Sequence, residues 1–277
     1  MEPSSVTIVG TGYQVAGHLT LESRAAIEGA DKLFYLVNDK VSETYLAELN
    51  ASAESLADSY AEGRPGSDSS EEMVQRVLAA LDDGRKVCVA FAGHPAVLLP
   101  PAHDVLRLAR QRGHVAKMLP AVSAMGCLFA EIGLDPGIGG CVVFEATDFL
   151  VYDRQFDPNS PLILLQIGVI GLTDYVAQSP YCAERLAILA EVLMRVYPPD
   201  HEVVVYQAEV LPIGASVIHR APLARLSEAP VTVISTLCVP PLGRAAEDAE
   251  MRARIRDYFP PEAGPAVEIG PEPARKI

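Results

Sequence analysis

The feature that most constrains the fold is an apolar, β-prone run, Lys86-Val-Cys-Val-Ala-Phe-Ala92, which ends at Gly93. Such a run is typical of a buried parallel strand whose end passes the chain to a binding loop. Gly93 has no Cβ, so a flat or charged ligand can come close to its backbone. Pro95 fixes the loop and keeps Gly93 and His94 out of a helix. The sequence therefore predicts a binding loop directly after this strand.

Strand-like runs alternate with amphipathic helical stretches through the first half of the chain. Strands are expected at residues 6–9, 33–37, 87–92 and 115–119, and helices at 20–27, 41–49, 71–81 and 103–112. This rhythm predicts an α/β domain at residues 5–118 with a mostly parallel sheet covered by helices.

The second half follows a different pattern. Strands are expected at residues 141–145, 162–167, 202–206 and 231–237, and one long helix at 183–196. Loops rich in Pro, Asp and Ser separate them, which indicates a mixed α+β domain at residues 119–258. Residues 259–277 are expected to form a Pro-rich tail. The polar, Gly- and Ser-rich residues 51–70 are predicted to be a surface loop or lid.

Charge and cysteine content exclude several classes of protein. The 277 residues include 22 basic and 36 acidic side chains, a net charge of −14, which disfavours binding to a nucleic-acid backbone. The longest apolar runs are well short of the ~20 residues that a membrane span needs. The five cysteines are dispersed without a CxxC pair, which favours reduced thiols and no metal site. No signal peptide is visible, so we expect a soluble, cytoplasmic protein.

A glycine pair follows the first expected strand. Gly10-Thr11-Gly12 invites a dinucleotide interpretation, but the third glycine of that fingerprint would fall on Val15. We therefore interpret this segment as a tight strand-to-loop turn.

Few polar side chains form a recognisable catalytic pattern. His94 could act as a general base, but beside Gly and Pro at a strand end we interpret it as orienting the loop. Glu145, Asp148 and Asp174 have no partner at metal-ligand spacing. No Gly-x-Ser-x-Gly elbow is present, so hydrolysis has little support.

Taken together, an ordered set of segments resembles the tetrapyrrole-methylase-like, class III S-adenosylmethionine methyltransferases. Within that group the chain is most similar to the borosin peptide backbone α-N-methyltransferases. The matching segments are Val9-Gly-Thr-Gly12, Gly93-His-Pro95, Met118-Leu-Pro-Ala-Val-Ser-Ala124, Cys127-Leu-Phe-Ala130, Asp135-Pro136, Phe144-Glu-Ala-Thr-Asp-Phe-Leu150, Gln166-Ile-Gly168, Pro199-Asp-His201 and Ile234-Ser-Thr236.

The resemblance implies a two-domain tetrapyrrole methylase fold with S-adenosylmethionine in the cleft between the domains, no metal, and a homodimer. It also implies which residues contact the cofactor: Gly93, His94, Pro95, Val97, Ser123, Ala124, Gln166, Tyr206, Ala208, Ser235 and Thr236. Fungal borosin enzymes carry their peptide substrate as a C-terminal extension, whereas the last residues here show no apolar Val/Ile/Gly-rich core. We therefore expect the substrate to be a separate precursor peptide of ribosomal origin.

The chain also departs from the borosin family in the side chains that activate a weakly nucleophilic amide. Tyr60 matches the family, but Gly66 and Ser70 stand where an arginine and a tyrosine are expected, and Ala92 where another tyrosine is expected. Arg64 lies two positions from the expected arginine, so Tyr60 and Arg64 are the catalytic candidates. Other possible hydroxyl donors are Tyr13, Tyr35 and Tyr175.

Three hypotheses follow. The first is backbone N-methylation of a separate borosin-type peptide. The second is N-methylation of a small-molecule or side-chain amine, which needs less activation than an amide. The third is a cofactor-binding scaffold with little catalysis.

Overall fold

The computed structural model describes residues 4–61, 65–172, 182–211 and 214–255. These residues form two compact units. Unit 1 contains residues 4–61 and 65–127 together with 208–211 and 214–215, and unit 2 contains residues 128–172, 182–207 and 216–255. The sequence-based domain limits stay a prediction, and the expected tail lies outside the described residues.

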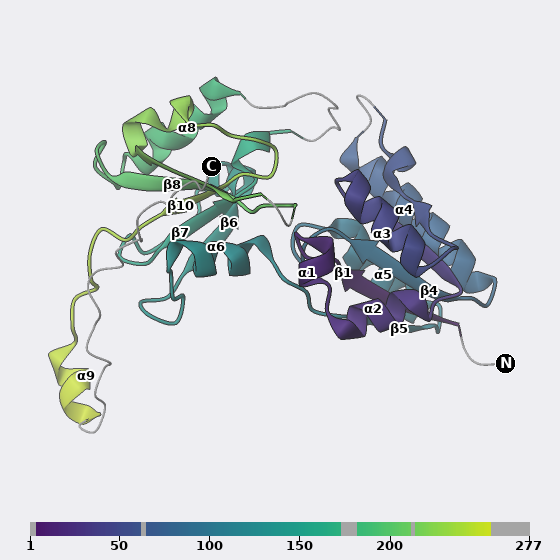
Figure 1. Cartoon of the computed structure of the whole chain (residues 1–277). Helices are drawn as coiled ribbons and strands as arrows, with labels where there is room; N and C mark the ends of the chain where they lie inside the picture. The colour runs from purple at the N-terminus through teal and green to yellow at the C-terminus, as the bar shows by residue number, and fades with distance from the viewer. Residues whose placement is uncertain (1–3, 62–64, 173–181, 212–213, 256–277) are drawn as a thin grey trace. The chain divides into compact units, whose positions relative to one another are not determined.

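Unit 1 is built on a five-stranded parallel sheet in the order β3-β2-β4-β1-β5 (Figure 1). Its elements are β1 (Ser5–Gly10), α1 (Val15–His18), α2 (Leu21–Glu28), β2 (Lys32–Leu36), α3 (Lys40–Leu49), β3 (Glu54–Ser55), the 3-10 helix η1 (Ala57–Ser59), α4 (Gly66–Asp82), β4 (Lys86–Phe91), α5 (Pro100–Gln111) and β5 (Val115–Met118). Helix α6 (Ala124–Ile132) begins in the last residues of unit 1's first stretch of chain, which ends at Cys127.

Alternation along β4 divides the core of unit 1 between the two faces of the sheet. Val87, Val89 and Phe91 point to the face covered by α4 and α5. Cys88 and Ala90 point to the other face, which is packed by α2 and α3. All five side chains are at most 1% exposed. A continuous apolar run is what a strand covered on both faces requires, so this part of the prediction is confirmed.

Helices α2 and α3 of unit 1 begin where the sequence supplies a capping side chain. Thr20 Oγ1 accepts a hydrogen bond from the Ser23 N–H, and Asp39 Oδ1 accepts one from the Ser42 N–H. Each of these bonds satisfies a backbone donor that the first helical turn leaves without a partner.

The expected surface loop at residues 51–70 is wrong in part. It contains β3 and η1, and α4 begins at Gly66, five residues before the predicted start. Ser59 and Ser69 are both fully buried. The polar composition belongs to short structured segments and to the exposed face of a helix, which composition alone does not separate from a loop.

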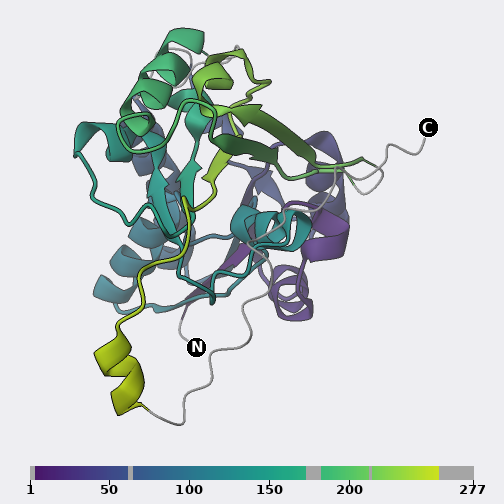
Figure 2. The same ribbon diagram turned by 90° about the vertical axis from the view of Figure 1, so that its left-hand side faces the viewer.

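Unit 2 contains a mixed sheet in the order β6-β7-β10-β8-β9, in which β6 and β7 are parallel and the other neighbours antiparallel. Its strands are coloured from teal to yellow-green in Figure 2. Its elements are β6 (Val142–Glu145), α7 (Ala146–Val151), β7 (Leu162–Leu165), the 3-10 helix η2 (Ile167–Val169), α8 (Ala183–Leu193), β8 (Glu202–Gln207), β9 (Val217–Pro222), the 3-10 helix η3 (Leu223–Glu228), β10 (Thr236–Val239) and α9 (Ala249–Arg254). The predicted mixed α+β character is confirmed. The expected strand at 231–237 is wrong in place, and β9 was not predicted.

One face of the unit 2 sheet is packed by α7, α8 and η3. Leu186, Leu189 and Leu193 of α8 lie in the same buried cluster as Leu164 and Val205 of the sheet. This apolar face stabilises unit 2 in the way that the two helical layers stabilise unit 1.

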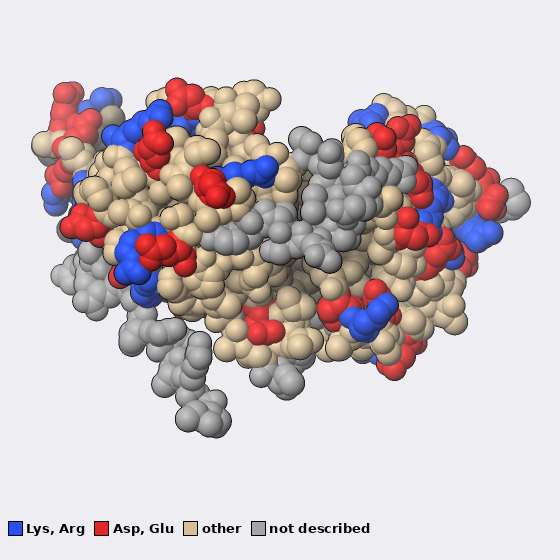
Figure 3. Space-filling view, turned by 90° about the horizontal axis from the view of Figure 1, so that it is seen from above, with Lys and Arg blue, Asp and Glu red and all other residues tan. Residues whose placement is uncertain are grey.

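The surface is charged but mixed in sign. On the face drawn in Figure 3, Lys and Arg side chains lie beside Asp and Glu side chains rather than in a single basic stretch. Among the described helices, none combines the length and apolar character that crossing a bilayer requires.

Candidate functional site

The turns that follow β1 and β4 are hydrogen-bonded to each other. Gly12 and Gly93 form an antiparallel bridge, in which the Gly93 N–H donates to the Gly12 carbonyl at 2.9 Å and the Gly12 N–H to the Gly93 carbonyl at 3.2 Å. Both glycines have positive φ, +68° and +70°, which explains why glycine occupies both positions. The tight turn predicted at residues 10–12 is therefore half of a two-loop structure.

Gly10 lies beneath these two loops, and other atoms pack against it so closely that no side chain would fit. A methyl carbon placed on Gly10 would lie 2.2 Å from the Gly93 carbonyl oxygen, 2.6 Å from the Ala121 Cβ and 2.7 Å from Pro95 Cδ. Three segments that are far apart in the sequence therefore meet at the carboxyl edge of the parallel sheet. This edge is where open α/β sheets bind ligands.

His94 shapes the predicted binding loop. Its Nδ1 accepts a hydrogen bond from the Ala96 N–H at 3.1 Å, and its carbonyl accepts one from the Val97 N–H at 3.1 Å. Both contacts close a turn, which agrees with an orienting role for His94. Pro95 is buried and Val97 half-buried.

The predicted contacts at the start of α6 lie in unit 1 as well. Ser123 Oγ accepts a hydrogen bond from the Met125 N–H at 3.3 Å, and the Ser123 carbonyl accepts one from the Cys127 N–H. Ala124 is the first residue of α6. Ala208, only 3% exposed, also belongs to unit 1 although it directly follows β8. Loop Gly93–Val97, Ser123, Ala124 and Ala208 thus share one unit.

Tyr60 occupies a defined position at the end of η1. Its N–H donates to the Ala57 carbonyl, and its half-buried side chain packs against the cluster beneath α4 and α5. Arg64, the second catalytic candidate, lies outside the described residues.

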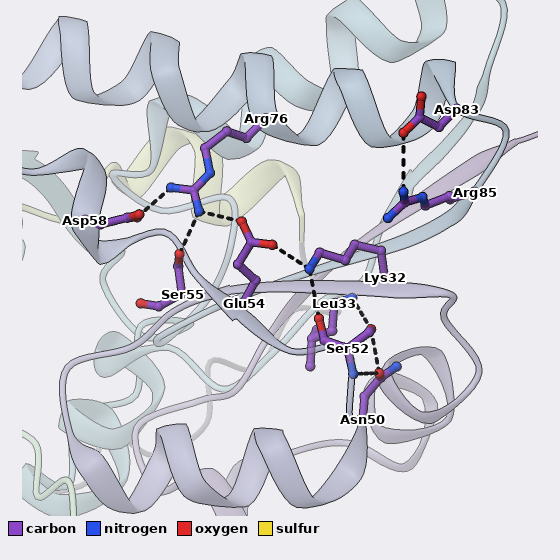
Figure 4. Close-up of polar contacts among 10 residues, drawn as sticks. All are labelled: Lys32, Leu33, Asn50, Ser52, Glu54, Ser55, Asp58, Arg76, Asp83 and Arg85. Carbon is purple, nitrogen blue, oxygen red and sulfur yellow. Dashed lines mark hydrogen bonds and ion pairs between the residues drawn. The ribbon is translucent and has the colours of Figure 1, made fainter.

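An arginine of α4 holds the segment that leads to Tyr60 (Figure 4). The Arg76 guanidinium donates to the carboxylates of Asp58 and Glu54 and to the Ser55 carbonyl. Glu54 also pairs with Lys32 of β2. These hydrogen bonds, first from Lys32 and then from Arg76, lower the pKa of Glu54. The network fixes β3 and η1 against α4, a role that the sequence analysis did not predict for Arg76.

The three positions that depart from the borosin pattern carry no activating group. Gly66 and Ser70 lie in the first turns of α4 and line a groove of about 580 Å³ between α4 and α5. Ala92 extends the sheet, since its N–H donates to the Leu36 carbonyl. Tyr13, in contrast, places its ring against Gly93.

The remaining predicted contacts lie in unit 2, on three neighbouring strands. Gln166, at the end of β7, has a left-handed backbone with φ +58°, and the next N–H, of Ile167, donates to the Ser235 carbonyl at 3.1 Å. Thr236 at the start of β10 pairs with Tyr206 of β8. Ser235, Thr236 and Tyr206 are at most 4% exposed. The four predicted residues of unit 2 are thus brought together.

Two residues that support this group were missed. Gly168 packs directly on the chain before β10, because a methyl carbon there would lie 2.0 Å from the Thr232 carbonyl oxygen. The Thr232 N–H donates to Ser235 Oγ at 2.9 Å. The absence of a side chain at Gly168 is a sequence signal for close packing. The sequence does not show what packs there, because Thr232 is more than sixty residues away.

The carboxylates considered as metal ligands have other partners. Glu145 caps α7 by accepting from the Asp148 N–H, and Asp148 pairs with Arg154, which lowers the pKa of the Asp148 carboxyl. Asp174 lies outside the described residues. Within the described ranges, no group of three or more His, Cys, Asp or Glu side chains is placed to hold a metal ion.

Comparison with solved structures defines the fold. The chain is similar to uroporphyrin-III-C-methyltransferase from Thermus thermophilus, with a TM-score of 0.61 and 19% identity over 86% of this chain and 92% of that chain. It is also similar to the cobalt precorrin-4 methyltransferase of cobalamin biosynthesis, with a TM-score of 0.59 and 15% identity over 84% and 93%. The predicted tetrapyrrole methylase fold is confirmed.

Sequence comparison then gives the family. The model of the tetrapyrrole (corrin/porphyrin) methylases matches residues 5–212, and the chain belongs to this family. A methyltransferase and type III borosin cyclic peptide precursor of Anomoporia bombycina is 35% identical over 98% of this chain and 33% of its own length.

Two further fungal relatives carry similar names. The methyltransferase and dendrothelin A precursor of Dendrothele bispora is 34% identical, and that for omphalotin A of Omphalotus olearius 33% identical, over 94% and 98% of this chain. The chain spans 63% and 64% of these two proteins. It therefore matches between a third and just under two thirds of the length of these relatives.

The chemistry of the two residue groups fits S-adenosylmethionine. The loops of unit 1 present backbone groups, glycines and small side chains, and none of the cofactor contacts predicted there or in unit 2 is a Lys or Arg. A sulfonium cation is not repelled by such a surface, because no basic side chain is among these contacts.

Proposed function

We propose that this chain is an S-adenosylmethionine-dependent methyltransferase that N-methylates backbone amides of a precursor peptide presented as a separate polypeptide. The observation that carries the proposal is the match of 94–98% of this chain to proteins named as both methyltransferase and cyclic peptide precursor. The paired loops at the carboxyl edge of unit 1 support it, since they form the kind of surface on which such a cofactor is held.

In this proposal the cofactor is held by Gly93, Pro95, Val97, Ser123, Ala124 and Ala208 of unit 1 and by Gln166, Tyr206, Ser235 and Thr236 of unit 2. When bound, the cofactor supplies an electrophilic methyl group on a sulfonium. The contribution of the chain is to orient the acceptor nitrogen in line with that methyl group and to exclude water. His94 keeps the loop in shape through its bond with the Ala96 N–H.

An amide nitrogen is a poor nucleophile until its proton is lost or its carbonyl is polarised. Tyr60 is the phenol that the family resemblance assigns to this task. Arg76 keeps Tyr60 in place by holding Glu54 and Asp58, which lie on the segment leading into it.

The test is co-expression with a short peptide encoded beside the gene. Mass spectrometry is expected to show additions of 14 Da that fragmentation places on backbone nitrogens. An unmodified peptide would contradict the proposal. Methylation of small amines without any peptide would favour the amine hypothesis, and tight cofactor binding without turnover would favour the scaffold.

A matched pair of glycine variants tests the cofactor loop. Gly93→Ala and Gly84→Ala place a side chain on a backbone of similar positive φ, +70° and +83°, but Gly84 lies in the turn before β4. We expect calorimetry to show about tenfold weaker S-adenosylmethionine binding for Gly93→Ala, since the strain is released by moving the loop, and little change for Gly84→Ala. Equal affinities in the two variants would exclude the loop as the binding surface. The predicted homodimer is proposed as well, and light scattering of the purified chain measures it.

A further inference from the structure

The geometry points to Tyr13 as a catalytic residue: we propose that its phenol donates a hydrogen bond to the carbonyl oxygen of the amide that accepts the methyl group. This inference rests on the proposed function. It supplies, from the turn after β1, the hydroxyl that Ala92 at the end of β4 does not have.

Tyr13 lies beside the loop that is proposed to hold the cofactor. A methyl carbon placed on Gly93 would lie 3.3 Å from Tyr13 Cε2 and 4.0 Å from its phenol oxygen. The bridge between Gly12 and Gly93 holds the residue before Tyr13 against the same loop. The phenol therefore lies at the carboxyl edge of the sheet, next to the glycine of the loop that is proposed to hold the cofactor.

The turn fixes the position of Tyr13. His18 Nδ1 accepts hydrogen bonds from the N–H groups of both Tyr13 and Gln14, each at 3.3 Å. Gly12 is packed on His18 so closely that a methyl carbon there would lie 2.2 Å from the His18 Cβ. The ring is thus carried by a short, closed turn, which is the support that a catalytic donor requires.

The hydroxyl of Tyr13 is available. Among the described residues, no group is hydrogen-bonded to it, although Tyr13 is half-buried. Burial raises the pKa of Tyr13, and the nearby Cys127 thiol acts in the same direction. The phenol therefore stays protonated near neutral pH, so it can donate a hydrogen bond but is not suited to remove a proton.

A donated hydrogen bond is what amide methylation needs. It stabilises negative charge on the carbonyl oxygen as the nitrogen attacks, and so draws the amide toward the imidate form. The nitrogen forms a bond to the methyl carbon, and the carbon–sulfur bond breaks with its electron pair remaining on sulfur. The methylated nitrogen is then strongly acidic, and it loses its proton to bulk water once the product leaves the site. The Tyr13 proton stays on its oxygen throughout.

The other tyrosines that the sequence offered as hydroxyl donors, and that the structure describes, are Tyr35 and Tyr60, and they are situated differently. Tyr35 lies on β2 and packs against the core between the sheet and α2 and α3. Tyr60 packs against the core on the opposite face. Tyr175 lies outside the described residues. The three atoms nearest to a methyl carbon placed on Gly93 all belong to Tyr13.

The test compares Tyr13→Phe with Tyr45→Phe, which removes the same atom from a half-buried tyrosine on α3. Each variant is assayed with the precursor peptide that the wild-type chain modifies. We expect Tyr13→Phe to lower kcat by about 100-fold, the usual cost of losing one such donor, with KM, cofactor affinity by calorimetry and the unfolding midpoint unchanged. Tyr45→Phe is expected to match the wild type.

The outcomes separate this inference from the proposed function. Peptide methylation by the wild type with an unchanged kcat in Tyr13→Phe would overturn the role of Tyr13 and leave the function standing. Loss of cofactor affinity in Tyr13→Phe would also overturn it, since the phenol would then hold the cofactor instead of the peptide. Absence of peptide methylation by the wild type would overturn the proposed function, and this role with it.

Discussion

Each unit brings its predicted cofactor-contacting residues together at the ends of neighbouring strands, but the strands run in different directions in the two units. In unit 1 all strands are parallel, so Gly12 and Gly93 both follow strands and meet at one edge. In unit 2, β7 and β10 are antiparallel, so Gln166 after one strand lies beside Ser235 before the other. A rule that looks for loops after strands therefore finds the predicted site residues of unit 1, but in unit 2 it finds Gln166 and misses Tyr206, Ser235 and Thr236.

Both groupings depend on a glycine under close contact. Gly10 supports the loops of unit 1, and Gly168 supports the segment before β10 in unit 2. This comparison between the two units predicts that a side chain added at either glycine destabilises the unit that contains it.

The largest expected effect is therefore that of adding a methyl group at these glycines. Gly168→Ala and Gly10→Ala should each lower the free energy of unfolding by about 3 kcal/mol, because backbone or Cβ atoms lie within 2.0–2.6 Å of the new carbon. Gly243→Ala, with no atom within 4 Å, is the control and should change it by less than about 0.5 kcal/mol.

Two buried thiols, one in each unit, allow the unfolding of the two units to be measured separately. Burial raises the pKa of Cys88 in unit 1 and of Cys238 in unit 2, each to about 12, so neither thiol should react with iodoacetamide at pH 8 until its surroundings unfold. We expect Gly10→Ala to lower the denaturant midpoint for labelling of Cys88, and Gly168→Ala that of Cys238, as resolved by peptide mass spectrometry. If both cysteines became reactive together in both variants, the units would unfold as one and the comparison would fail.

A smaller effect is expected at the edge of the unit 1 sheet. Arg76→Ala should lower the labelling midpoint of Cys88 by the equivalent of about 1 kcal/mol, because it removes the shared partner of the Glu54 and Asp58 carboxylates, which are themselves 42% and 71% exposed. Arg107→Ala, which removes an exposed pair with Asp104, should cost less than about 0.5 kcal/mol. Equal losses in the two variants would show that the network around Arg76 does not hold β3 and η1.

The smallest effect is a pH dependence from Glu54. Its folded pKa is below the unfolded one, so its contribution is present above about pH 4.5 and is lost as the pH falls through the folded value. Since the Glu54 side chain is 42% exposed, solvent screening limits this contribution to about 0.5 kcal/mol. Denaturant titrations between pH 7 and pH 3 should show a flatter profile for Glu54→Gln than for the wild type, whereas Glu228→Gln in an exposed pair of unit 2 should follow the wild type. An unchanged profile for Glu54→Gln would contradict the network.

The sequence predicted β1, β2, β4 and β5 of unit 1 well because each is a short apolar run that ends at a turn residue. It missed β3, two polar residues inside the expected surface loop. It misplaced β10, since Val231-Thr-Val-Ile234 is β-branched but contains a turn that Ser235 Oγ holds through the Thr232 N–H. It missed β9, whose half-exposed residues Val217–Pro222 pair only with β8. Local pattern describes buried strands, whereas an edge strand is defined by its neighbour.

The site residues differ in the same way: those defined by local sequence were predicted, and those defined by distant contacts were not. Gly93 was found because glycine chemistry is visible locally. The place of Tyr13 was not, because its ring lies against Gly93 only where a backbone bridge joins Gly12 to Gly93, 81 positions further along the chain. The residues of unit 2 came from the family resemblance and not from spacing.

The reciprocal bonds between Gly12 and Gly93 have a practical consequence for engineering. Two turns that share donors and acceptors behave as one exchangeable part, so a loop grafted from a relative into the Gly93 segment brings its own shape to the Gly10-Thr11-Gly12 turn as well. Enzyme libraries that vary the two segments jointly should retain folded members, whereas libraries that change the length of one alone should lose them.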